Sequence, residues 1–559
     1  MYAQAAEIHR KSGDLEKAER SAELAAASTQ ASGDLWAVPQ RLQALAELQV
    51  AQERYAEADR VYDRAEAFID SLIGKVSTVL EKTAVITASG QIYSQHFSLV
   101  AEHFKDARKA YSIIEQVRGR VAAELLAAGS VSTPGAKSTE RTISQLRLKL
   151  MSARSTDEVR VLRNQIFIAE QARWVTPGIS ILKTKLQEPV GIEQVQQALA
   201  PSAMLLEYVL ADPSSYCLTI SRSGSHIVRL DGKTQIEPLV AAYLNAVEAK
   251  LPGVAEARAL YDALIRPIRE ADQQRTLIIV RDGQLHLVPF DGLRDPVGHF
   301  VVETRTVIYS PSATSFHLLM EQKQRPRTAN YALLAIGGIP YSRSPINRAG
   351  LARGHDHRSF VDLPSSADEV EIAQAAFSKK KSKLLLGTSA TEAAFKASNL
   401  AEYRVIHLAV HGFADPTFSN RAALVLLSDR RAGEDGFLQA SEIVQLRFDT
   451  DLIVLSACDT AVGPLQGQEG IANLSRAFLL AGARTVVSTL WQVDDTSSLF
   501  LMKRFYAHLS VNRPAASALT AAKRDMLRTF GRKAVPYQWA GFTIEGAVGR
   551  PISSNEGHE

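Results

Sequence analysis

Cysteine is scarce in this sequence: Cys217 and Cys458 are the two thiols among 559 residues. Two cysteines exclude a disulfide framework and a cysteine-rich zinc site, and they are typical of a chain that folds in a reducing compartment. The first residues, Met1–Ala5, lack the basic and apolar regions of a secretory signal. From these absences we expect a cytoplasmic protein.

Long apolar runs and a strong net charge are also missing. No run of about 18 apolar residues is present, so we expect no membrane-spanning helix. The net charge of +4 is small for this length and does not indicate a nucleic-acid-binding surface. The one dense basic run, Lys379–Lys381 with Lys383, is interpreted as a solvated helix end rather than a surface for an acidic partner.

Two short apolar runs lead directly into reactive side chains. Arg404–Val410 is followed by His411, and Asp451–Ala457 is followed by Cys458. Their composition predicts strands buried on both faces of a parallel sheet, where ligands bind at the carboxyl ends. The segment between them is long enough for a parallel crossover, which needs about a dozen residues. The runs therefore predict a paired base and nucleophile. The alternative is a turn histidine and a buried apolar cysteine.

The residue order in these two motifs resembles that of a known family. His-Leu-Ala-Val-His-Gly at 407–412 and Leu-Ser-Ala-Cys-Asp-Thr at 455–460 are similar to the paired signatures of the CHAT family, caspase-like proteins associated with tetratricopeptide repeats. More distantly they resemble the clan of caspases, metacaspases, gingipains and separase. Further similarity at 282–293 and 491–495 extends the resemblance over roughly 189–544. The resemblance implies an α/β caspase-like domain, a mostly parallel sheet flanked by helices.

The resemblance also implies roles for the two motif residues. In the clan, the histidine before glycine is the base and the cysteine closing the later strand is the nucleophile, which places these roles on His411 and Cys458. The backbone N–H groups of Gly412 and Cys458 would then stabilise the oxyanion. The clan usually works with a dyad, and it implies neither a metal nor a cofactor. Because a free thiol has a pKa of about 8.5, the base is needed to form the thiolate.

Two other hydrolase mechanisms fit the sequence less well. His407 and His411 have the spacing of a helical zinc motif, but Leu408 stands where that motif needs a glutamate. In a strand, four residues span about 13 Å, too far for both imidazoles to bind one metal. We therefore expect His407 to be a packed or hydrogen-bonded strand residue and Cys217 to be a packing residue. A serine hydrolase lacks its Gly-x-Ser-x-Gly motif here.

Acidic residues lie beside the expected site. Asp459 follows the cysteine, Asp415 follows the histidine loop, and Asp494 and Asp495 end the next predicted strand after Trp491. A desolvated carboxylate pairs well with a guanidinium, so we expect a basic residue, Arg or Lys, immediately before the cleaved bond. We expect Asp494 at the pocket floor and Trp491 at a wall. The alternative, helix capping by these acids, applies most strongly to Asp495.

The chain divides by pattern into four segments, which we expect at 1–125, 126–188, 189–550 and 551–559. The first is helical throughout and contains three similar segments, at 13–18, 53–58 and 103–107. These are similar to tetratricopeptide repeats, with a spacing above the usual period of about 34 residues. A plain helical bundle is the alternative. The second is a helical connector, the third the CHAT domain and the last a disordered tail.

Several finer predictions concern the connector and the sheet. We expect a loop at 129–138, a helix stop at Thr176–Gly178, and a tight turn at Asp282–Gly283 that leads into a second strand at 284–288. The motif at 537–542 resembles the last strand of the family. Other strands are predicted at 204–210, 216–221, 227–230, 276–281, 331–336, 384–386 and 484–490.

Together these patterns predict a cysteine endopeptidase that cleaves protein substrates with His411 and Cys458. Stacked repeats form extended binding surfaces, so the repeat region is expected to bind a protein or peptide that supplies or regulates the substrate. The alternative is a catalytically inactive caspase-like scaffold that mediates protein–protein interaction. Slow and nonselective reaction of Cys458 with peptide electrophiles would favour the scaffold.

Overall fold

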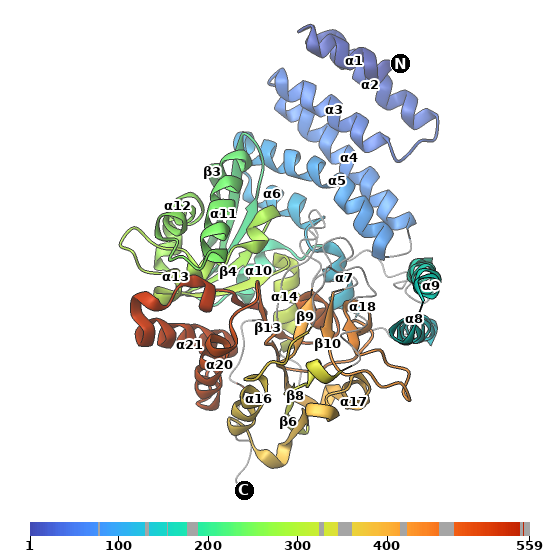
Figure 1. The fold of residues 1–559 in the computed structure, drawn as a ribbon. Helices are drawn as coiled ribbons and strands as arrows, with labels where there is room; N and C mark the ends of the chain where they lie inside the picture. The colour runs from blue at the N-terminus through green and yellow to red at the C-terminus, as the bar shows by residue number, and fades with distance from the viewer. Residues whose placement is uncertain are drawn as a thin grey trace.

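The computed structural model describes residues 1–76, 79–128, 134–153, 155–175, 188–323, 329–344, 360–413, 422–457, 474–547 and 552. Cys458, Asp459 and Asp415 lie outside the described residues, as do the predicted stop at Thr176–Gly178 and, apart from residue 552, the predicted tail. In Figure 1 a helical arm carries the N-terminus at its far end, away from the sheet. None of the helices within the described ranges has both the length and the apolar character needed to cross a bilayer.

The N-terminal region is entirely helical, as the sequence predicts. Successive helices pack against one another, and small residues such as Ala18, Ala46 and Ala58 are fully buried where they meet. Aspartates cap two of the helices: Asp14 accepts from Lys17 N–H and Asp106 from Arg108 N–H. The helices are α1 (Tyr2–Lys11), α2 (Leu15–Ala31), α3 (Val38–Ala51), α4 (Tyr55–Lys75), α5 (Val79–Leu99, continued by the π-helical η1, Val100–Phe104), α6 (Ala107–Glu115) and α7 (Arg120–Ala128).

The connector consists of two helices, α8 (Pro134–Ser152) and α9 (Thr156–Val175), followed by the short α10 (Ile192–Ala198). The loop predicted at 129–138 is wrong from residue 134 onward, because proline starts the helix, where its missing N–H costs no hydrogen bond. Residues 129–133 lie outside the described ranges. The two helices lie together beside the arm in Figure 1.

A mixed sheet of eleven strands forms the centre of the C-terminal region, in the order β3-β2-β1-β4-β5-β14-β13-β12-β8-β6-β7. Within the described chain the pairs β1–β2, β2–β3 and β13–β14 are antiparallel and the other neighbours are parallel. The strands are β1 (Ala203–Val209), β2 (Ser214–Ser221), β3 (Gly224–Asp231), β4 (Thr276–Val280), β5 (Thr306–Ser310), β6 (Tyr331–Gly337), β7 (Ser382–Leu386), β8 (Tyr403–Leu408), β12 (Leu452–Leu455), β13 (Thr485–Thr489) and β14 (Phe542–Gly546).

Two predictions about strands are wrong. The segment expected as a second strand at 284–288 is the 3-10 helix η4 (Gly283–Leu287), because β4 already pairs with β1 on one side and β5 on the other. Gly283 turns the chain away with a φ of +49°. The last strand starts only at Phe542, and the motif before it forms the 3-10 helix η13 (Pro536–Gln538).

A second, three-stranded antiparallel sheet lies after β8. It consists of β9 (His411–Phe413), β10 (Ala423–Val425) and β11 (Phe437–Gln439), in the order β11-β10-β9. β8 therefore ends at Leu408, two residues before the end of the run predicted at 404–410, and His411 is the first residue of β9. The helices around the sheets are α11 (Lys233–Glu248), α12 (Val254–Leu264), α13 (Val301–Thr304), α14 (Ala313–Lys323), α16 (Ser366–Ala375), α17 (Glu392–Ala397), α18 (Ala440–Ile443), α19 (Leu474–Leu480), α20 (Asp495–Ser510) and α21 (Ala515–Phe530).

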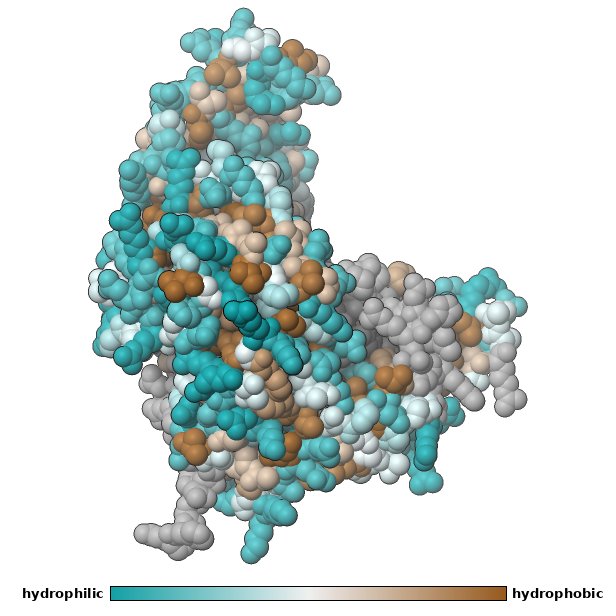
Figure 2. All heavy atoms as spheres, turned by 60° about the vertical axis from the view of Figure 1, so that its left-hand side comes forward, coloured by the Kyte–Doolittle hydropathy of each residue, from teal (hydrophilic) through white to brown (hydrophobic). Residues whose placement is uncertain are grey.

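The arm shares a hydrophobic core with the sheet. On one face of β1, Leu205 and Val209 pack in the same cluster as residues of α4–α6, whereas Leu206 and Tyr208 pack in the core of the opposite face. This alternation is the period of a strand buried on both faces. Figure 2 shows an outer face that is largely hydrophilic, with apolar side chains scattered over it as on most folded proteins.

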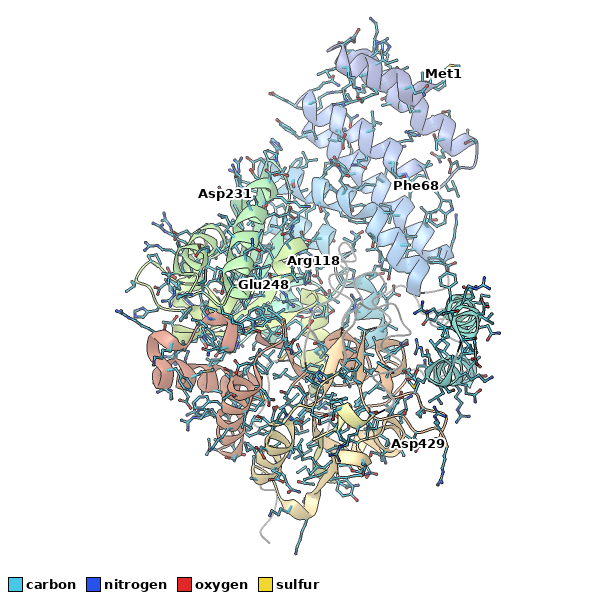
Figure 3. All side chains as sticks on the ribbon, in the orientation of Figure 1. Met1, Phe68, Arg118, Asp231, Glu248 and Asp429 are labelled. Carbon is cyan, nitrogen blue, oxygen red and sulfur yellow. The ribbon has the colours of Figure 1, made fainter. Side chains whose placement is uncertain are left out.

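Buried polar contacts fasten the base of the arm to the sheet domain. The guanidinium of Arg118 lies 3.4 Å from Glu207 and 3.3 Å from Asp282, and it also donates to the Tyr208 carbonyl. Figure 3 labels Arg118 at the centre of the molecule, between the arm and the sheet. The Glu115 carboxylate accepts from the N–H groups that start α14, at 3.0 Å and 2.7 Å. The last arm helices are therefore part of the sheet domain's interior.

Candidate functional site

The two strands predicted to carry the site are parallel neighbours. Val405 pairs with Leu452 and Leu408 with Leu455, so β8 and β12 reach the same edge of the sheet. Ser456 N–H donates to the Leu408 carbonyl at 3.0 Å, which continues the pairing one residue beyond β12. Beyond this edge the segment that follows β8 continues to His411. The segment that follows β12 reaches Ala457, which immediately precedes Cys458 in the sequence.

The His411 imidazole is held in one orientation. Its Nε2 lies 2.7 Å from the Val361 carbonyl oxygen, which accepts hydrogen bonds but cannot donate them, so Nε2 carries a proton. In the neutral ring Nδ1 then has the free lone pair and is the nitrogen that can take up a proton. Burial lowers the pKa of His411 below 6.5, against the opposing effects of the Val361 hydrogen bond and the Asp362 charge. The ring is therefore neutral at pH 7, as a general base requires.

Two aromatic rings enclose this imidazole. The ring centroids of Tyr341 and Phe360 lie 4.7 Å and 5.3 Å from that of His411. The Tyr341 hydroxyl accepts from His411 N–H at 3.1 Å and donates to the Val425 carbonyl at 2.7 Å, so it fixes the backbone of β9 against β10. Neither of the groups that orient His411, the Val361 carbonyl and the Tyr341 hydroxyl, is predicted from the sequence. Any residue can supply a backbone carbonyl such as that of Val361. A single tyrosine, here the first residue of the 3-10 helix η6 (Tyr341–Arg343), forms no sequence pattern.

Gly412 and Cys458 are the expected oxyanion donors. Gly412 is buried in β9, opposite Leu424 of β10, one residue beyond the imidazole. Glycine leaves the approach to its N–H group free of a side chain. The other donor, the backbone N–H of Cys458, lies outside the described residues.

A cavity of 380 Å³ lies at the same edge of the sheet. Ala409 and Val410 line it just before His411, and Ser456 and Ala457 line it just before Cys458. Thr489, the last residue of β13, lines it too and donates to the Ala457 carbonyl at 2.5 Å. Three strand ends thus meet at one cavity, the position where ligands bind in open α/β sheets.

Three side chains predicted to bind substrate are described, and two of them line this cavity. Asp494 is exposed and is the N-cap of α20, where it accepts from Ser497 N–H at 2.9 Å. Asp495 accepts from Ser365 N–H, before α16, at 2.8 Å. Capping, which the sequence analysis assigned most strongly to Asp495, is thus a role of Asp494. Asp459 lies outside the described residues.

Trp491 packs beside the cavity instead of lining it. Its indole N–H donates to the Tyr537 carbonyl at 2.8 Å, and the two rings stack with centroids 6.5 Å apart. A Cβ at Gly541 would lie 2.7 Å from the indole, so that position has room only for glycine. Among the described residues, Tyr537 and Phe542 are the aromatic side chains that line the cavity.

Glu369 also lines the cavity, and the sequence analysis did not assign it to the site. The pair Gly337–Gly338 explains its position. A Cβ at Gly337 would lie 2.6 Å from the Ser366 carbonyl, and Gly338 N–H donates to the Ser366 hydroxyl at 2.9 Å. The glycines therefore let the first turn of α16, with Glu369, approach the end of β6. The glycine pair is present in the sequence, but two adjacent glycines are compatible with any close approach of two backbone segments and do not point to Glu369.

His407 is a buried strand residue, as predicted. It is fully buried in β8, its Nδ1 lies 2.8 Å from the Tyr506 hydroxyl, and its Nε2 lies 3.2 Å from Glu369. Cys217 is likewise fully buried in β2, and burial raises the pKa of its thiol well above the ordinary value. A thiol in this state is a poor nucleophile.

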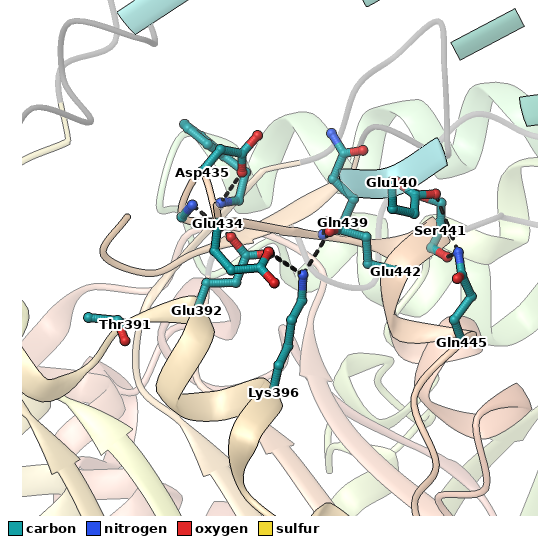
Figure 4. Close-up of polar contacts among 12 residues, drawn as sticks. Glu140, Thr391, Glu392, Lys396, Glu434, Asp435, Gln439, Ser441, Glu442 and Gln445 are labelled. Atoms are coloured by element: carbon teal, nitrogen blue, oxygen red, sulfur yellow. Dashed lines mark hydrogen bonds and ion pairs between the residues drawn. The ribbon is translucent and has the colours of Figure 1, made fainter. Parts of the chain in front are cut away.

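Two groups of described residues have the spacing of metal ligands, and in both a lysine ammonium contacts the carboxylates. Glu392, Glu434 and Glu442 each lie 2.8 Å from the Lys396 ammonium. Figure 4 shows the three labelled glutamates around Lys396. In the other group, Asp59, Asp63 and His96, the Lys109 ammonium lies 2.6 Å from Asp59 and 3.3 Å from Asp63. Since each site already has its cation, neither indicates a metal or cofactor.

Comparison with known proteins agrees with the motifs. Tetratricopeptide repeat protein 28 of Mus musculus is 25% identical over 334 residues, which cover 52% of this chain and 13% of that protein. The Homo sapiens protein of the same name is 24% identical over 335 residues, with the same two coverages. The chain thus spans about an eighth of the length of the curated relatives it matches.

Similarity to solved structures is weaker. The Saccharomyces cerevisiae separase–securin complex aligns with a TM-score of 0.38 and 11% identity, over 98% of this chain and 49% of that chain. Gingipain R, described as an Arg-specific cysteine proteinase, aligns with a TM-score of 0.32 and 11% identity, over 58% of this chain and 70% of that chain. The CHAT domain family model matches residues 254–547, more than half of the sequence. The chain therefore belongs to the CHAT domain family.

Proposed function

We propose that this protein is a caspase-like cysteine endopeptidase, with His411 as the base and Cys458 as the nucleophile. One observation carries the proposal: parallel neighbours β8 and β12 end at one cavity, immediately before these two residues. The neutral, oriented imidazole of His411 supports it, because a base must be unprotonated and correctly directed before it can act.

The proposed reaction has two halves. His411 Nδ1 takes the proton of the Cys458 thiol, and the thiolate attacks the carbonyl carbon of the peptide bond. The N–H groups of Gly412 and Cys458 stabilise the oxyanion, a contribution worth about 100- to 1000-fold per donor. The C–N bond then breaks as the imidazolium protonates the leaving amine. In the second half His411 deprotonates a water, which hydrolyses the thioester and releases the thiol.

The substrate of this proposal is a protein cut after a basic residue, Arg or Lys. The cavity beside the strand ends is lined by three carboxylates, Glu369, Asp494 and Asp495, and these favour a cation. Asp459, which follows the nucleophile, is the further candidate contact. Trp491 contributes by holding Tyr537 at the cavity wall.

The arm is proposed to bind a protein or peptide that presents or regulates the substrate, in the cytoplasm. Its stacked helices form an extended surface of the kind that repeat proteins use for binding. The names of the curated relatives, tetratricopeptide repeat proteins, fit this role.

The test is a cleavage-site profile over a peptide library, with Cys458→Ala and His411→Ala as variants. Each variant is expected to lose roughly a thousandfold or more in kcat/KM while its thermal unfolding is unchanged, and the double variant should be little worse, since the two residues act as a unit. Cys217→Ala, at the buried thiol, is the matched control and should keep its activity. Full activity in Cys458→Ala would end the endopeptidase proposal and favour the scaffold.

A further inference from the structure

The three carboxylates that line the cavity are not equivalent. Asp494 and Asp495 each accept a hydrogen bond from a backbone N–H near a helix start, at 2.9 Å and 2.8 Å. Such donors stabilise a carboxylate without any ligand. The positions of these two aspartates are therefore explained by the fold. The position of Glu369 is not explained in this way.

Glu369 is buried without a full set of partners. Its side chain is 3% exposed, and its Oε1 is buried with no hydrogen bond among the described residues. The side chain beside it in the described chain is His407, whose Nε2 lies 3.2 Å from Oε1 without the alignment of a hydrogen bond. Taking a carboxylate out of water is costly unless a cation or several donors compensate. A bound cation would supply that compensation.

The surroundings of Glu369 hold its carboxylate in place. Tyr506, fully buried, lies with its hydroxyl 2.8 Å from His407 Nδ1, so the imidazole is held in place beside the carboxylate. On the other side, α16 is fixed against β6 by the contact of Ser366 with Gly337 and Gly338. The carboxylate is therefore positioned before any ligand arrives, which limits the entropy lost on binding.

The cavity also places Glu369 within the proposed active site. Its walls include the residues that directly precede His411 and Cys458, so it lies beside the two proposed catalytic residues in the sequence. The one lysine among the described lining residues, Lys250, is exposed and lies 4.7 Å from the centre of the Tyr537 ring. Solvent screens an exposed ammonium, so Lys250 does not neutralise a buried carboxylate.

We propose that Glu369 is the specificity-determining carboxylate of this cavity and binds the guanidinium or ammonium group of an Arg or Lys side chain that precedes the cleaved bond. This rests on the proposed endopeptidase function and assigns its specificity to a residue of α16 instead of Asp494. An arginine fork matches the two oxygens of one carboxylate, so Arg should be preferred to Lys.

Kinetics with matched peptides test the assignment. The best library peptide is made with Arg, Lys, citrulline or Asp before the cleaved bond, citrulline being the neutral isostere of Arg. The intact protein is expected to cut the Arg peptide roughly 100-fold better than the citrulline peptide. Glu369→Gln should bring this ratio close to 1 with citrulline cleavage little changed, and Glu369→Asp should keep part of it.

Asp494→Asn and Asp495→Asn are the matched controls, since both change a cavity-lining acid to its amide. Both should keep most of the ratio of Arg to citrulline cleavage, because each leaves the Glu369 carboxylate in the cavity. Loss of the ratio in Asp494→Asn with retention in Glu369→Gln would overturn the assignment. So would a preference for Asp, or an equal loss for all peptides in Glu369→Gln, which indicates a purely structural role.

A binding measurement separates this inference from the proposed function. The Cys458→Ala chain cannot form a thioester, so its dissociation constants for the Arg and citrulline peptides report recognition alone. Tighter binding of the Arg peptide that disappears when Glu369→Gln is added supports the inference. Where the wild-type chain cleaves nothing, the parent peptide is the library member that binds the Cys458→Ala chain most tightly, and the same comparison applies. Equal binding of both peptides overturns it, including where cleavage at Cys458 is established.

Discussion

At the residue scale, the state of His411 sets the pH range in which the proposed reaction works. Burial lowers the pKa of His411 below 6.5, so the imidazole remains unprotonated to a lower pH than a solvent-exposed histidine does. The acidic limb of the kcat/KM profile, which reports the free enzyme, is therefore expected below pH 6.5. Because the thiol and the imidazole titrate as a coupled pair, the apparent pKa read from this limb is a property of the pair and not of His411 alone. A limb above pH 6.5 would contradict this prediction.

A charge change near the ring checks the assignment of that limb. The Asp362 carboxylate raises the pKa of His411, so Asp362→Asn should move the limb to lower pH. Asp34→Asn, in the distant arm, is the matched control and should leave the profile in place.

The sequence predicts some residues of this site better than others. His411 and Cys458 stand out because each follows a strand-like run, and the structure brings the ends of those two runs together. The Val361 carbonyl and the Tyr341 hydroxyl orient His411 through contacts between segments 50 and 70 residues apart. Backbone groups and single side chains of this kind leave no local pattern. Glu369 was visible only as a favourable charge in the first turn of a helix.

At the scale of elements, prediction succeeded for most strands that are buried on both faces, although it missed β5, and it failed where the local turn decides the structure. Most residues of the runs at 404–410 and 451–457 lie in the strands β8 and β12, because each run is covered on both faces. The Asp282–Gly283 turn suggested a hairpin, but both edges of β4 were already paired. A turn dipeptide contains no information about which edges are free.

The junction of β6 with α16 gives a prediction at this scale. Gly337→Ala places a Cβ 2.6 Å from the Ser366 carbonyl and 2.8 Å from Val370, so α16 must move away from the sheet. We expect a loss of about 1–3 kcal/mol in the free energy of unfolding, as for other overpacked positions. Because Glu369 moves with α16, KM for peptides with Arg before the cleaved bond should rise more than KM for citrulline peptides.

Denaturant unfolding and peptide kinetics measure the two effects. Gly74→Ala is the control, since Gly74 lies within α4 with nothing inside 4 Å of the added Cβ, and helix propensity there favours alanine by about 1 kcal/mol. Wild-type stability in Gly337→Ala would show that α16 tolerates the shift. It would also contradict the explanation that the two glycines are needed for α16 to approach β6.

At the scale of the whole molecule, the arm has an outer part and a base that differ in role. The base supplies Glu115 and Arg118 to the interior of the sheet domain and shares its core. The outer helices α1 and α2 touch only other arm helices among the described elements with substantial contacts. Regulation or recruitment by the arm is therefore best tested on its outer part, because removing the base would disturb the sheet itself.

Two truncations separate these roles. Deleting residues 1–37, which contain α1 and α2, should leave kcat/KM for short peptides within about threefold while lowering turnover of the protein substrate, because a binding surface is lost and the site is not. Deleting residues 1–120 removes Glu115 and Arg118, leaves Glu207 buried without its cation, and should give a chain without cooperative thermal unfolding. Equal turnover of the protein substrate with and without residues 1–37 would refute a recruiting role for the outer arm. Cooperative unfolding of the longer deletion would show that the sheet domain folds without the base of the arm, and its peptide kinetics would then measure the contribution of the whole arm.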